Sequence, residues 1–291
     1  MTKAIVFGGS GFLGSHVCDA LTKAGYEVRI FDIKPSRYLK IGQQMVVADI
    51  LDEDAVRKAI KGCDYVYNFA GTAQIEDSKK DPVKAVKTNI LGTVNILEGC
   101  GAFKVKRFIF ASTLYVYSNS GSFYRSTKQA CELLIENYHE IYGLDFTILR
   151  YGSLYGPRAN QDNWINRILR QVLTESKITR HGDGEEIREY IHVLDAARLS
   201  VDVLEKDFNN DYVIIAGNQS IKIKDLFVMI REMLNGKVKL EFLATDSKEH
   251  YEITPYNFSP KLAKRIHSSS YVDLGQGILD LMDQIYKEIR Q

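Results

Sequence analysis

The sequence lacks the features that mark membrane-embedded and exported proteins. It contains no apolar run near the length that spans a bilayer, and it begins on an apolar strand pattern without a basic and apolar leader. We therefore expect a cytoplasmic protein with no membrane partner.

Metal-ligand spacing is also missing. The four cysteines are scattered through apolar or helical stretches, at Cys18, Cys63, Cys100 and Cys131. This distribution is typical of reduced core thiols rather than of metal ligands. Three histidines share no ligand spacing either, namely His16, His181 and His192. The sequence thus predicts no metal site.

The chain has almost no excess charge of either sign. Lys plus Arg number 38 and Asp plus Glu number 37, so the formal net charge is +1. This balance gives no global basic field that would attract nucleic acid, and none is expected as a partner. Any anionic partner must be held by a local site.

What is present begins with a glycine-rich turn. The β-branched and aromatic run 3–7 leads into Gly8-Gly9-Ser10-Gly11-Phe12-Leu13-Gly14, after which apolar residues recur at helical spacing. The pattern predicts a strand, a turn and a helix. Glycines at positions 8, 11 and 14 keep side chains away from a pyrophosphate, and free N–H groups at the helix start face that anion. A dinucleotide is the expected ligand.

An acidic residue follows at the distance that such a site requires. Residues 27–31 form a second strand pattern, which ends at Asp32, about twenty residues beyond the glycine turn. A carboxylate there accepts hydrogen bonds from ribose hydroxyls and repels a 2′-phosphate. NAD is therefore favoured over NADP, although Lys34 and Arg37 are placed to tolerate a phosphate.

The first half of the chain alternates between strand and helix patterns. Strands are expected at 3–7, 27–31, 44–48, 64–69, 106–111 and 145–150, helices at 52–61, 82–101 and 126–143, and a loop at 72–81. Parallel neighbours need crossover connections, which helices supply. We therefore predict an α/β fold with a doubly wound parallel (Rossmann) sheet.

The pattern changes after Tyr151. Further helices are expected at 160–174, from Asp195 as N-cap to 206, at 222–234 and at 272–289, with short strands at 189–193 and 212–216. We predict an NAD-binding Rossmann domain over 1–151, to which a segment at about 188–216 returns. Residues 152–291 are expected to form mainly a small mixed α/β substrate-binding lobe.

Three residues carry the expected chemistry. Thr113 follows the fifth strand, and Tyr124 and Lys128 stand four apart on the next helix, so they share one face. A lysine ammonium beside a phenol favours the phenolate, which makes a usable general base. Thr113 is placed to donate to the same substrate oxygen. All three belong to the carboxyl edge of the sheet, where open α/β sheets bind ligands.

With these residues the chain resembles the extended short-chain dehydrogenase/reductases of the nucleotide-sugar epimerase/dehydratase family. The matching motifs are Gly8-x-x-Gly11-x-x-Gly14, Asp32, Asp49-Ile50, Ala70-Gly71, Thr88-Asn89-x-x-Gly92-Thr93, Ser112-Thr113-x-x-Val116-Tyr117, Tyr124-x-x-x-Lys128, Arg150-Tyr151-x-x-x-Tyr155-Gly156-Pro157-Arg158 and Gly182-x-Gly184-x-x-x-Arg188-x-Tyr190-Ile191-His192-Val193. The resemblance implies an NAD-dependent enzyme, a homodimer paired through the helices at 83–101 and 126–142, and a nucleoside-diphosphate sugar as partner.

The resemblance also implies roles for individual residues. Tyr124 takes a proton from a sugar hydroxyl that Thr113 orients, and Lys128 bonds the nicotinamide ribose. Cofactor-binding residues are expected at Gly8, Gly11, Phe12, Leu13, Asp32, Asp49, Ile50, Ala70, Gly71 and Lys128. Substrate contacts are expected at Thr72, Thr113, Ser153 and Arg188, the last of which meets the diphosphate. Asn89 fits either a proton relay or helix packing.

The chain departs from the family pattern in four places. Only ten residues separate Thr113 from Tyr124, so part of the usual wall over the sugar is missing. Ser153 stands where many epimerases have asparagine, and no arginine appears around 250–256 for a second diphosphate contact. Leu114-Tyr115 replaces the Asp-Glu pair of the 4,6-dehydratases, so water elimination is not expected.

The expected reaction is oxidation of a secondary hydroxyl, at C4, of a nucleoside-diphosphate sugar. A 4-epimerase and a 4-dehydrogenase need the same threonine, tyrosine and lysine, and so does a ketoreductase of a nucleotide keto-sugar. A different class, a non-catalytic NAD-sensing protein, needs only the cofactor residues. The intact site at Thr113, Tyr124 and Lys128 favours an enzyme.

Overall fold

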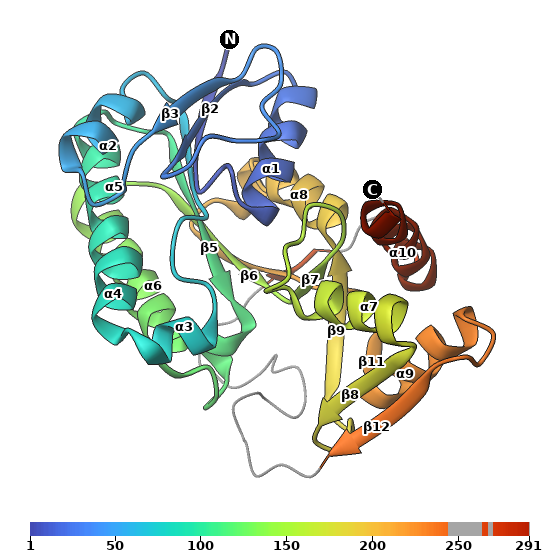
Figure 1. Cartoon of the computed structure of the whole chain (residues 1–291). Coiled ribbons are helices and arrows are strands. Elements are labelled where there is room, and N and C mark those ends of the chain that lie inside the picture. The colour runs from blue at the N-terminus through green and yellow to red at the C-terminus, as the bar shows by residue number, and fades with distance from the viewer. Residues whose placement is uncertain (244–263, 267–269, 291) are drawn as a thin grey trace.

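A central parallel sheet organises the molecule (Figure 1). The computed structural model describes residues 1–243, 264–266 and 270–290, so the stretch 250–256 considered above lies outside the described residues. Eight strands pair in the order β13-β10-β6-β5-β4-β1-β2-β3. Their bounds are β1 Lys3–Phe7, β2 Glu27–Asp32, β3 Gln44–Val47, β4 Tyr65–Asn68, β5 Arg107–Thr113, β6 Phe146–Tyr151, β10 Asp211–Ile215 and β13 Lys264–Arg265.

The sheet is doubly wound. Every neighbouring pair of its strands is parallel. The chain starts at β1, moves outward through β2 and β3, and then crosses back to β4, β5 and β6 on the other side of β1. The order therefore reverses between β1 and β4, which is the position where such sheets bind ligands. The predicted fold class is confirmed.

Alternation along the strands builds two cores. In β1, Ala4 and Val6 pack on one face of the sheet and Ile5 and Phe7 on the other. The first core is covered by α1 (Phe12–Lys23) and α8 (Val193–Asp202), and the second by α2 (Glu53–Ile60), α5 (Gly92–Ala102) and α6 (Ser122–Tyr142). Burial of both faces explains why these strands are almost continuously apolar.

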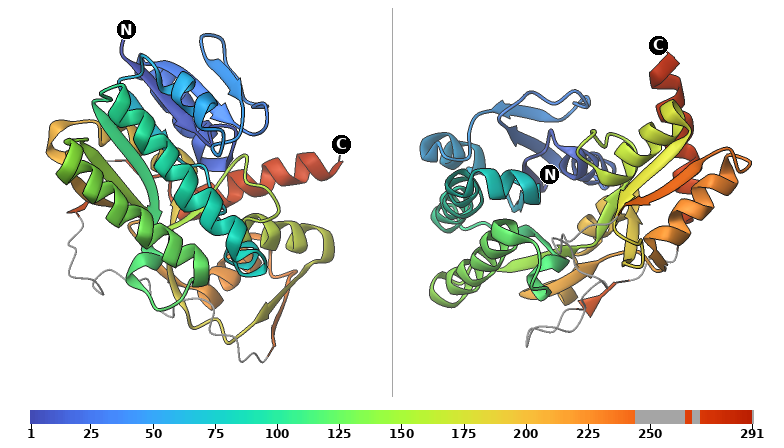
Figure 2. Two further views of the ribbon diagram at one scale, coloured as in Figure 1. Left: turned by 90° about the vertical axis from the view of Figure 1, so that its left-hand side faces the viewer. Right: turned by 60° about the horizontal axis from the view of Figure 1, so that its bottom comes forward.

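The second lobe has its own core. A three-stranded sheet joins β7 (Ser153–Tyr155), β9 (Ile187–His192) and β11 (Ser220–Lys222), while β8 (Lys177–His181) pairs with β12 (Lys239–Leu243). Three helices pack with these strands, namely α7 (Trp164–Glu175), α9 (Ile223–Met233) and α10 (Leu274–Arg290). Figure 2 shows this lobe set beside the Rossmann sheet and its helices.

Within the segment 188–216, the two parts of the chain interleave. The strand β9 belongs to the sheet of the lobe, whereas α8 packs against α1 and β10 pairs with β6 of the central sheet. The return to the central sheet thus begins at Val193, because β9 finds its partners in β7 and β11. The division of the chain at residue 151 stays a prediction.

The segment expected as a loop at 72–81 contains a helix instead, α3 (Ile75–Lys80). Acidic residues occupy its first turn and lysines its last, which complements the helix dipole despite the polar composition. Pro82 then begins α4 (Pro82–Val86) with Asp81 as N-cap, and a π-helical turn over Lys87–Leu91 connects it to α5. The predicted long helix is therefore present with one wide turn.

The starts of α7 and α8 also differ from expectation. The helix α7 begins at Trp164, not at 160, because the side chain of Asn163 accepts a hydrogen bond from the backbone of Asn166 and caps it. The N-cap of α8 is His192 rather than Asp195, which lies in the first turn. The strand β8 was not expected, since its polar sequence gains strand structure only by pairing with the distant β12.

Candidate active site

The glycine turn between β1 and α1 is shaped by close packing. Gly8 has a positive φ of 76°, and a Cβ there would lie 2.6 Å from the backbone nitrogen of Ala70. A Cβ on Gly14 would meet the carbonyl of Gly8, whereas one on Gly11 would meet that same oxygen only at 3.2 Å. Gly8 and Gly14 therefore let the strand, turn and helix approach one another, while Gly11 lies at the exposed helix start.

The start of α1 fits an anionic ligand. Its N-cap is Gly11, which offers no side chain to the N–H groups of the first turn. Uncapped N–H groups at a helix start, together with the helix dipole, form a site for phosphate oxygens. Leu13 is buried and Phe12 half-buried beneath this turn, where their side chains anchor the helix.

Asp32 stands at the end of β2 beside this turn. Its carboxylate oxygens accept hydrogen bonds from the backbone of Ser10 at 3.0 Å and of Lys34 at 3.2 Å. Each carboxylate oxygen has a second acceptor site, so the geometry is compatible with ribose hydroxyls as further donors. The glycine turn and the strand end are thereby tied into one surface.

Further expected cofactor residues lie along the same edge. Asp49 accepts a hydrogen bond from the backbone of Leu51, and the buried Ile50 packs against Gly92 of α5. Ala70 and Gly71 follow β4, and Gly71 adopts an extended positive φ of 154°. Asp49 and Ile50 follow β3, whereas Ala70 follows β4 and lies against Gly8 of the glycine turn. Their contacts with a cofactor remain predictions.

Asn89 holds two segments of the site together. From the π-helical turn, its amide oxygen accepts from the backbone of Thr72 at 2.7 Å, and its amide nitrogen donates to Thr127 at 2.9 Å. A Cβ on Gly71 would lie 2.7 Å from that amide oxygen. The side chain therefore links the segment after β4 to α6.

Thr113 and Tyr124 lie close to each other at the carboxyl edge of the sheet. Thr113 is the last residue of β5, and its hydroxyl accepts a hydrogen bond from the backbone of Tyr115 at 3.3 Å. The helix α6 begins at Ser122 rather than at 126, so Tyr124 stands in its first turn. The Tyr115 and Tyr124 rings meet edge to face at 6.3 Å between centroids.

Lys128 lies buried below these residues. Its ammonium donates to the carbonyl of Ala111 at 2.7 Å and lies 4.6 Å from the centre of the Phe110 ring. Burial lowers the pKa of Lys128 to about 8, because the charged form loses its hydration. The ammonium form still predominates at neutral pH.

A buried ion pair connects the elements that carry Thr113 and Tyr124. Arg150 on β6 makes two hydrogen bonds to the Glu132 carboxylate, at 2.6 and 3.0 Å, and both side chains are almost fully buried. Ser112, next to Thr113, donates to Glu132 at 2.5 Å, and Arg150 also donates to Tyr117 at 2.5 Å. The network joins β5, α6 and β6 directly under the candidate site.

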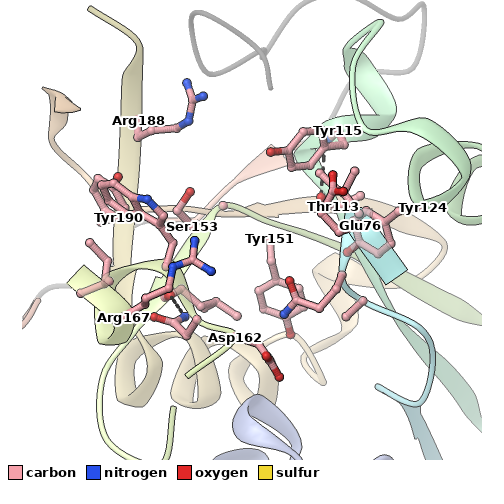
Figure 3. A pocket seen from close by; sticks show the side chains of 18 of the residues that line it. Glu76, Thr113, Tyr115, Tyr124, Tyr151, Ser153, Asp162, Arg167, Arg188 and Tyr190 are labelled. Atoms are coloured by element: carbon pink, nitrogen blue, oxygen red, sulfur yellow. Dashed lines mark hydrogen bonds between the residues drawn. The ribbon is translucent and has the colours of Figure 1, made fainter. Parts of the chain in front are cut away.

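A cavity of about 390 Å³ opens between the wall that carries Thr113 and Tyr124 and the second lobe (Figure 3). Thr113, Tyr115 and Tyr124 lie on one side, and Arg167, Arg188 and Tyr190 lie on the other. The remaining lining residues are Ala73, Gln74, Ile75, Glu76, Tyr151, Gly152, Ser153, Leu154, Asp162, Asn163, Trp164, Ile165, Arg180 and Ile223.

The cavity brings together four of the residues predicted to act on or contact the substrate, namely Thr113, Tyr124, Ser153 and Arg188. Thr72 is not among the lining residues, although its neighbours from Ala73 to Glu76 are. Lys128 lies behind the wall rather than in it.

Sequence reasoning missed several lining residues. Arg167 and Arg180 were not singled out, since one lies on the exposed side of α7 and the other on the unexpected strand β8. Glu76 belongs to α3, in the segment for which the sequence predicts a loop. Arg180 pairs with Glu186 at 2.6 Å, and its Nε atom is buried without a described hydrogen-bond partner. Three guanidinium groups therefore line the lobe side, where planar charged forks suit phosphate oxygens.

A family model identifies the chain. The model of the NAD dependent epimerase/dehydratase family matches residues 4–216. The chain belongs to this family. Its members are NAD-dependent enzymes of the short-chain dehydrogenase/reductase type, so the predicted family, enzyme class and cofactor are confirmed. The glycine turn, the uncapped helix start and Asp32 fit that cofactor.

Similar proteins within the epimerase/dehydratase family are named as sugar-nucleotide enzymes. A UDP-glucuronate 4-epimerase from Thermodesulfobacterium geofontis is 29% identical over 272 residues, which cover 82% of this chain and 83% of the relative. A putative UDP-glucose 4-epimerase from Methanocaldococcus jannaschii is 27% identical, covering 94% of this chain and 95% of its own length.

Solved structures agree in fold. A UDP-glucose 4-epimerase from Thermotoga maritima, determined with UDP-glucose, superimposes with a TM-score of 0.87 at 25% identity, covering 99% of this chain and all of that one. A UDP-glucuronic acid 4-epimerase from Bacillus cereus, in complex with UDP-glucuronic acid and NAD, gives 0.82 at 29% identity, covering 98% of this chain and all of that one.

Two further findings bear on the expected partners. No helix among the described residues is both long and apolar enough to cross a bilayer. In the same part of the chain, no group of three or more histidine, cysteine or carboxylate side chains is arranged to hold a metal ion.

Proposed function

We propose that this protein is an NAD-dependent UDP-sugar 4-epimerase, which oxidises the C4 hydroxyl of a sugar nucleotide and reduces the resulting keto sugar on its other face. The observation that carries the proposal is the cavity wall on which Thr113 and Tyr124 lie together, opposite a wall that contains Arg188. The names of the relatives support UDP as the nucleotide and C4 as the carbon.

The protein's own residues divide the work of proton transfer. Thr113 donates a hydrogen bond to the substrate hydroxyl oxygen and holds it toward Tyr124. The Tyr124 phenolate accepts the hydroxyl proton as the C4–H bond breaks, and returns it when the new C–H bond forms. NAD, when bound, supplies the hydride acceptor and donor for this exchange.

Lys128 favours the phenolate form of Tyr124. It follows Tyr124 by one helical turn on α6, and its positive charge disfavours a protonated phenol on the same helix face. Its pKa of about 8 leaves the charge in place at neutral pH. In our proposal its ammonium also bonds the ribose next to the nicotinamide.

The lobe wall holds the nucleotide end of the substrate. Arg188 on β9 is the proposed contact of the diphosphate, and Arg167 and Arg180 are close enough to share the same cavity. Ser153 adds a hydroxyl at the start of the lobe. Leu114 and Tyr115 contribute no carboxylate after Thr113, so the arrangement favours epimerisation over elimination of water.

The test is turnover of a UDP-sugar panel by the purified protein without added NAD. We expect C4 epimers to interconvert, as followed by NMR, with no net formation of NADH and with NAD released from the denatured protein. Stoichiometric NADH with a free keto sugar would instead establish a dehydrogenase. Retained NAD without turnover of any sugar nucleotide would contradict an enzymatic role on these substrates.

A further inference from the structure

Tyr115 occupies an unusual place in the cavity. It lies two residues after Thr113 and forms part of the same cavity wall. Figure 3 shows its ring extending from the Thr113 side, with the phenol oxygen directed toward the wall that carries Arg188. An aromatic ring with a polar tip is therefore present beside the two side chains that act on the substrate hydroxyl.

Neighbours within the described part of the chain hold this ring in position. The Tyr115 backbone donates to the Thr113 hydroxyl at 3.3 Å, and the ring packs edge to face against Tyr124. Gly121 supports the third side, because a Cβ there would lie 2.8 Å from the Tyr115 ring. The orientation of Tyr115 is thus coupled to both residues of the proposed proton-transfer pair.

The connection between Thr113 and Tyr124 is short, which gives the Tyr115 ring its place in the cavity wall. Only ten residues join them, and they form a single 3₁₀ turn over Leu114–Tyr117, a bend and the start of α6. Gly121 adopts a positive φ of 99°, which lets the chain turn back directly over Tyr115. Because the connection is too short to form a longer loop over the cavity, the Tyr115 side chain completes this part of the cavity wall.

We infer that Tyr115 is a substrate-contacting residue that determines which sugar the enzyme accepts. Its ring packs against the apolar C–H face of the pyranose, and its phenol bonds to one hydroxyl other than the reacting one. This inference rests on the proposed function, since it takes a sugar nucleotide as the ligand of this cavity.

The direct test compares Tyr115→Phe and Tyr115→Ala with the wild type on the best substrate of the panel. Loss of the phenol hydroxyl removes one hydrogen bond, so we expect kcat/KM to fall about tenfold in Tyr115→Phe, mainly through KM. Tyr115→Ala also loses the ring, and we expect a fall on the order of a hundredfold. Asn119→Ala, an exposed position in the same connection, serves as the matched control and should behave as wild type.

Deoxy analogues of the substrate identify the contacted hydroxyl. With the wild type, the analogue that lacks the contacted hydroxyl should have a kcat/KM lowered by about the same factor as Tyr115→Phe shows with the parent sugar. Tyr115→Phe acting on that analogue should show little further loss of kcat/KM. A wild type that turns over the parent sugar while both Tyr115 variants match it would overturn this inference and leave the proposed function intact. A wild type without turnover would instead contradict the proposed function.

Gly121→Ala tests the positioning of the ring without altering a cavity side chain. We expect the added Cβ to displace Tyr115 and raise KM in the wild-type background, but to have little further effect on KM in Tyr115→Ala. Equal increases of KM in both backgrounds would show that Gly121 acts independently of Tyr115. Unfolding measured in parallel separates this effect from strain at the positive φ.

Discussion

At the residue scale, the proposed chemistry depends on one phenol. Tyr124 lines the cavity, and its ring is held against Tyr115 next to Thr113. A phenylalanine preserves the shape of this side chain but cannot accept or return a proton. We expect Tyr124→Phe to lower kcat about a thousandfold, within the range for loss of a general acid–base group.

Cofactor content distinguishes this loss from misfolding. Tyr124→Phe should retain NAD at the wild-type level, because the glycine turn and Asp32 are unchanged. Turnover equal to that of the wild type would show that another group moves the proton. A comparison by NMR turnover and by mass spectrometry of released NAD checks both parts.

Lys128 predicts a pH dependence of stability. Burial lowers its pKa in the folded protein to about 8, below its ordinary value of 10.5 in the unfolded chain. Below pH 8 both states carry the proton and the folded state bears the full cost of a buried charge. As the pH rises from 8 toward 10.5, the folded protein releases its proton first, so the stability contributed by this residue increases.

The comparison of wild type with Lys128→Met isolates this contribution in the cofactor-free protein. The unfolding free energy of the wild type minus that of Lys128→Met should increase by about 3 kcal/mol in total between pH 8 and pH 10.5. Urea unfolding at a series of pH values measures it. A difference that is constant with pH would contradict a lowered pKa of Lys128.

At the element scale, the Glu132 and Arg150 pair joins α6 to the central sheet. Glu132→Gln leaves the buried guanidinium without its carboxylate partner, so we expect a loss of about 3–5 kcal/mol of unfolding free energy. Arg170 and Glu288 form a more exposed pair at a similar distance, 2.7 Å. Glu288→Gln, which removes this carboxylate, should lower the unfolding free energy by less than about 1 kcal/mol. Equal costs in urea unfolding would show that burial is not what makes the first pair important.

The element scale also shows where local sequence signals succeed and where they fail. The strand β1 and the helix α1 follow directly from an apolar run, a glycine turn and helical periodicity. The helix α3 was mistaken for a loop because only its charge arrangement, and no apolar stripe, indicates a helix. The strand β8 is too polar to be recognised, and it exists because β12, about sixty residues later, supplies its hydrogen bonds.

At the scale of the whole molecule, the homodimer stays a prediction that exposed apolar side chains allow to be tested. Large apolar residues remain exposed along α4, the π-helical turn and α6, namely Val83, Val86, Leu91, Leu133 and Ile141. The predicted homodimer uses these helices. We expect about twice the chain mass of 33.1 kDa in light scattering, and a monomer for Leu133→Glu with unchanged circular dichroism. A wild-type monomer at micromolar concentration would contradict this prediction.

The sequence alone determined the fold class, the family and the cofactor, because each rests on short-range signals. The glycine turn, Asp32 and the alternation of strands with helices depend on residues that are close in the chain. The Thr113, Tyr124 and Lys128 set was predicted in the same way, from a strand end and one helical turn, and its roles stay predictions. Because these signals are local, they can be recognised in the sequence without knowledge of the packing.

Only the tertiary structure showed which residues besides Ser153 and Arg188 face this set. Arg167 and Arg180 share a cavity with Thr113 although more than fifty residues separate them in the chain, and no local pattern marks either one. The same holds for Tyr115, whose importance depends on Gly121 folding back over its ring. The substrate side of the cavity is built by chain segments that meet only when the lobe packs beside the sheet, and for that reason its composition could not be derived from spacing.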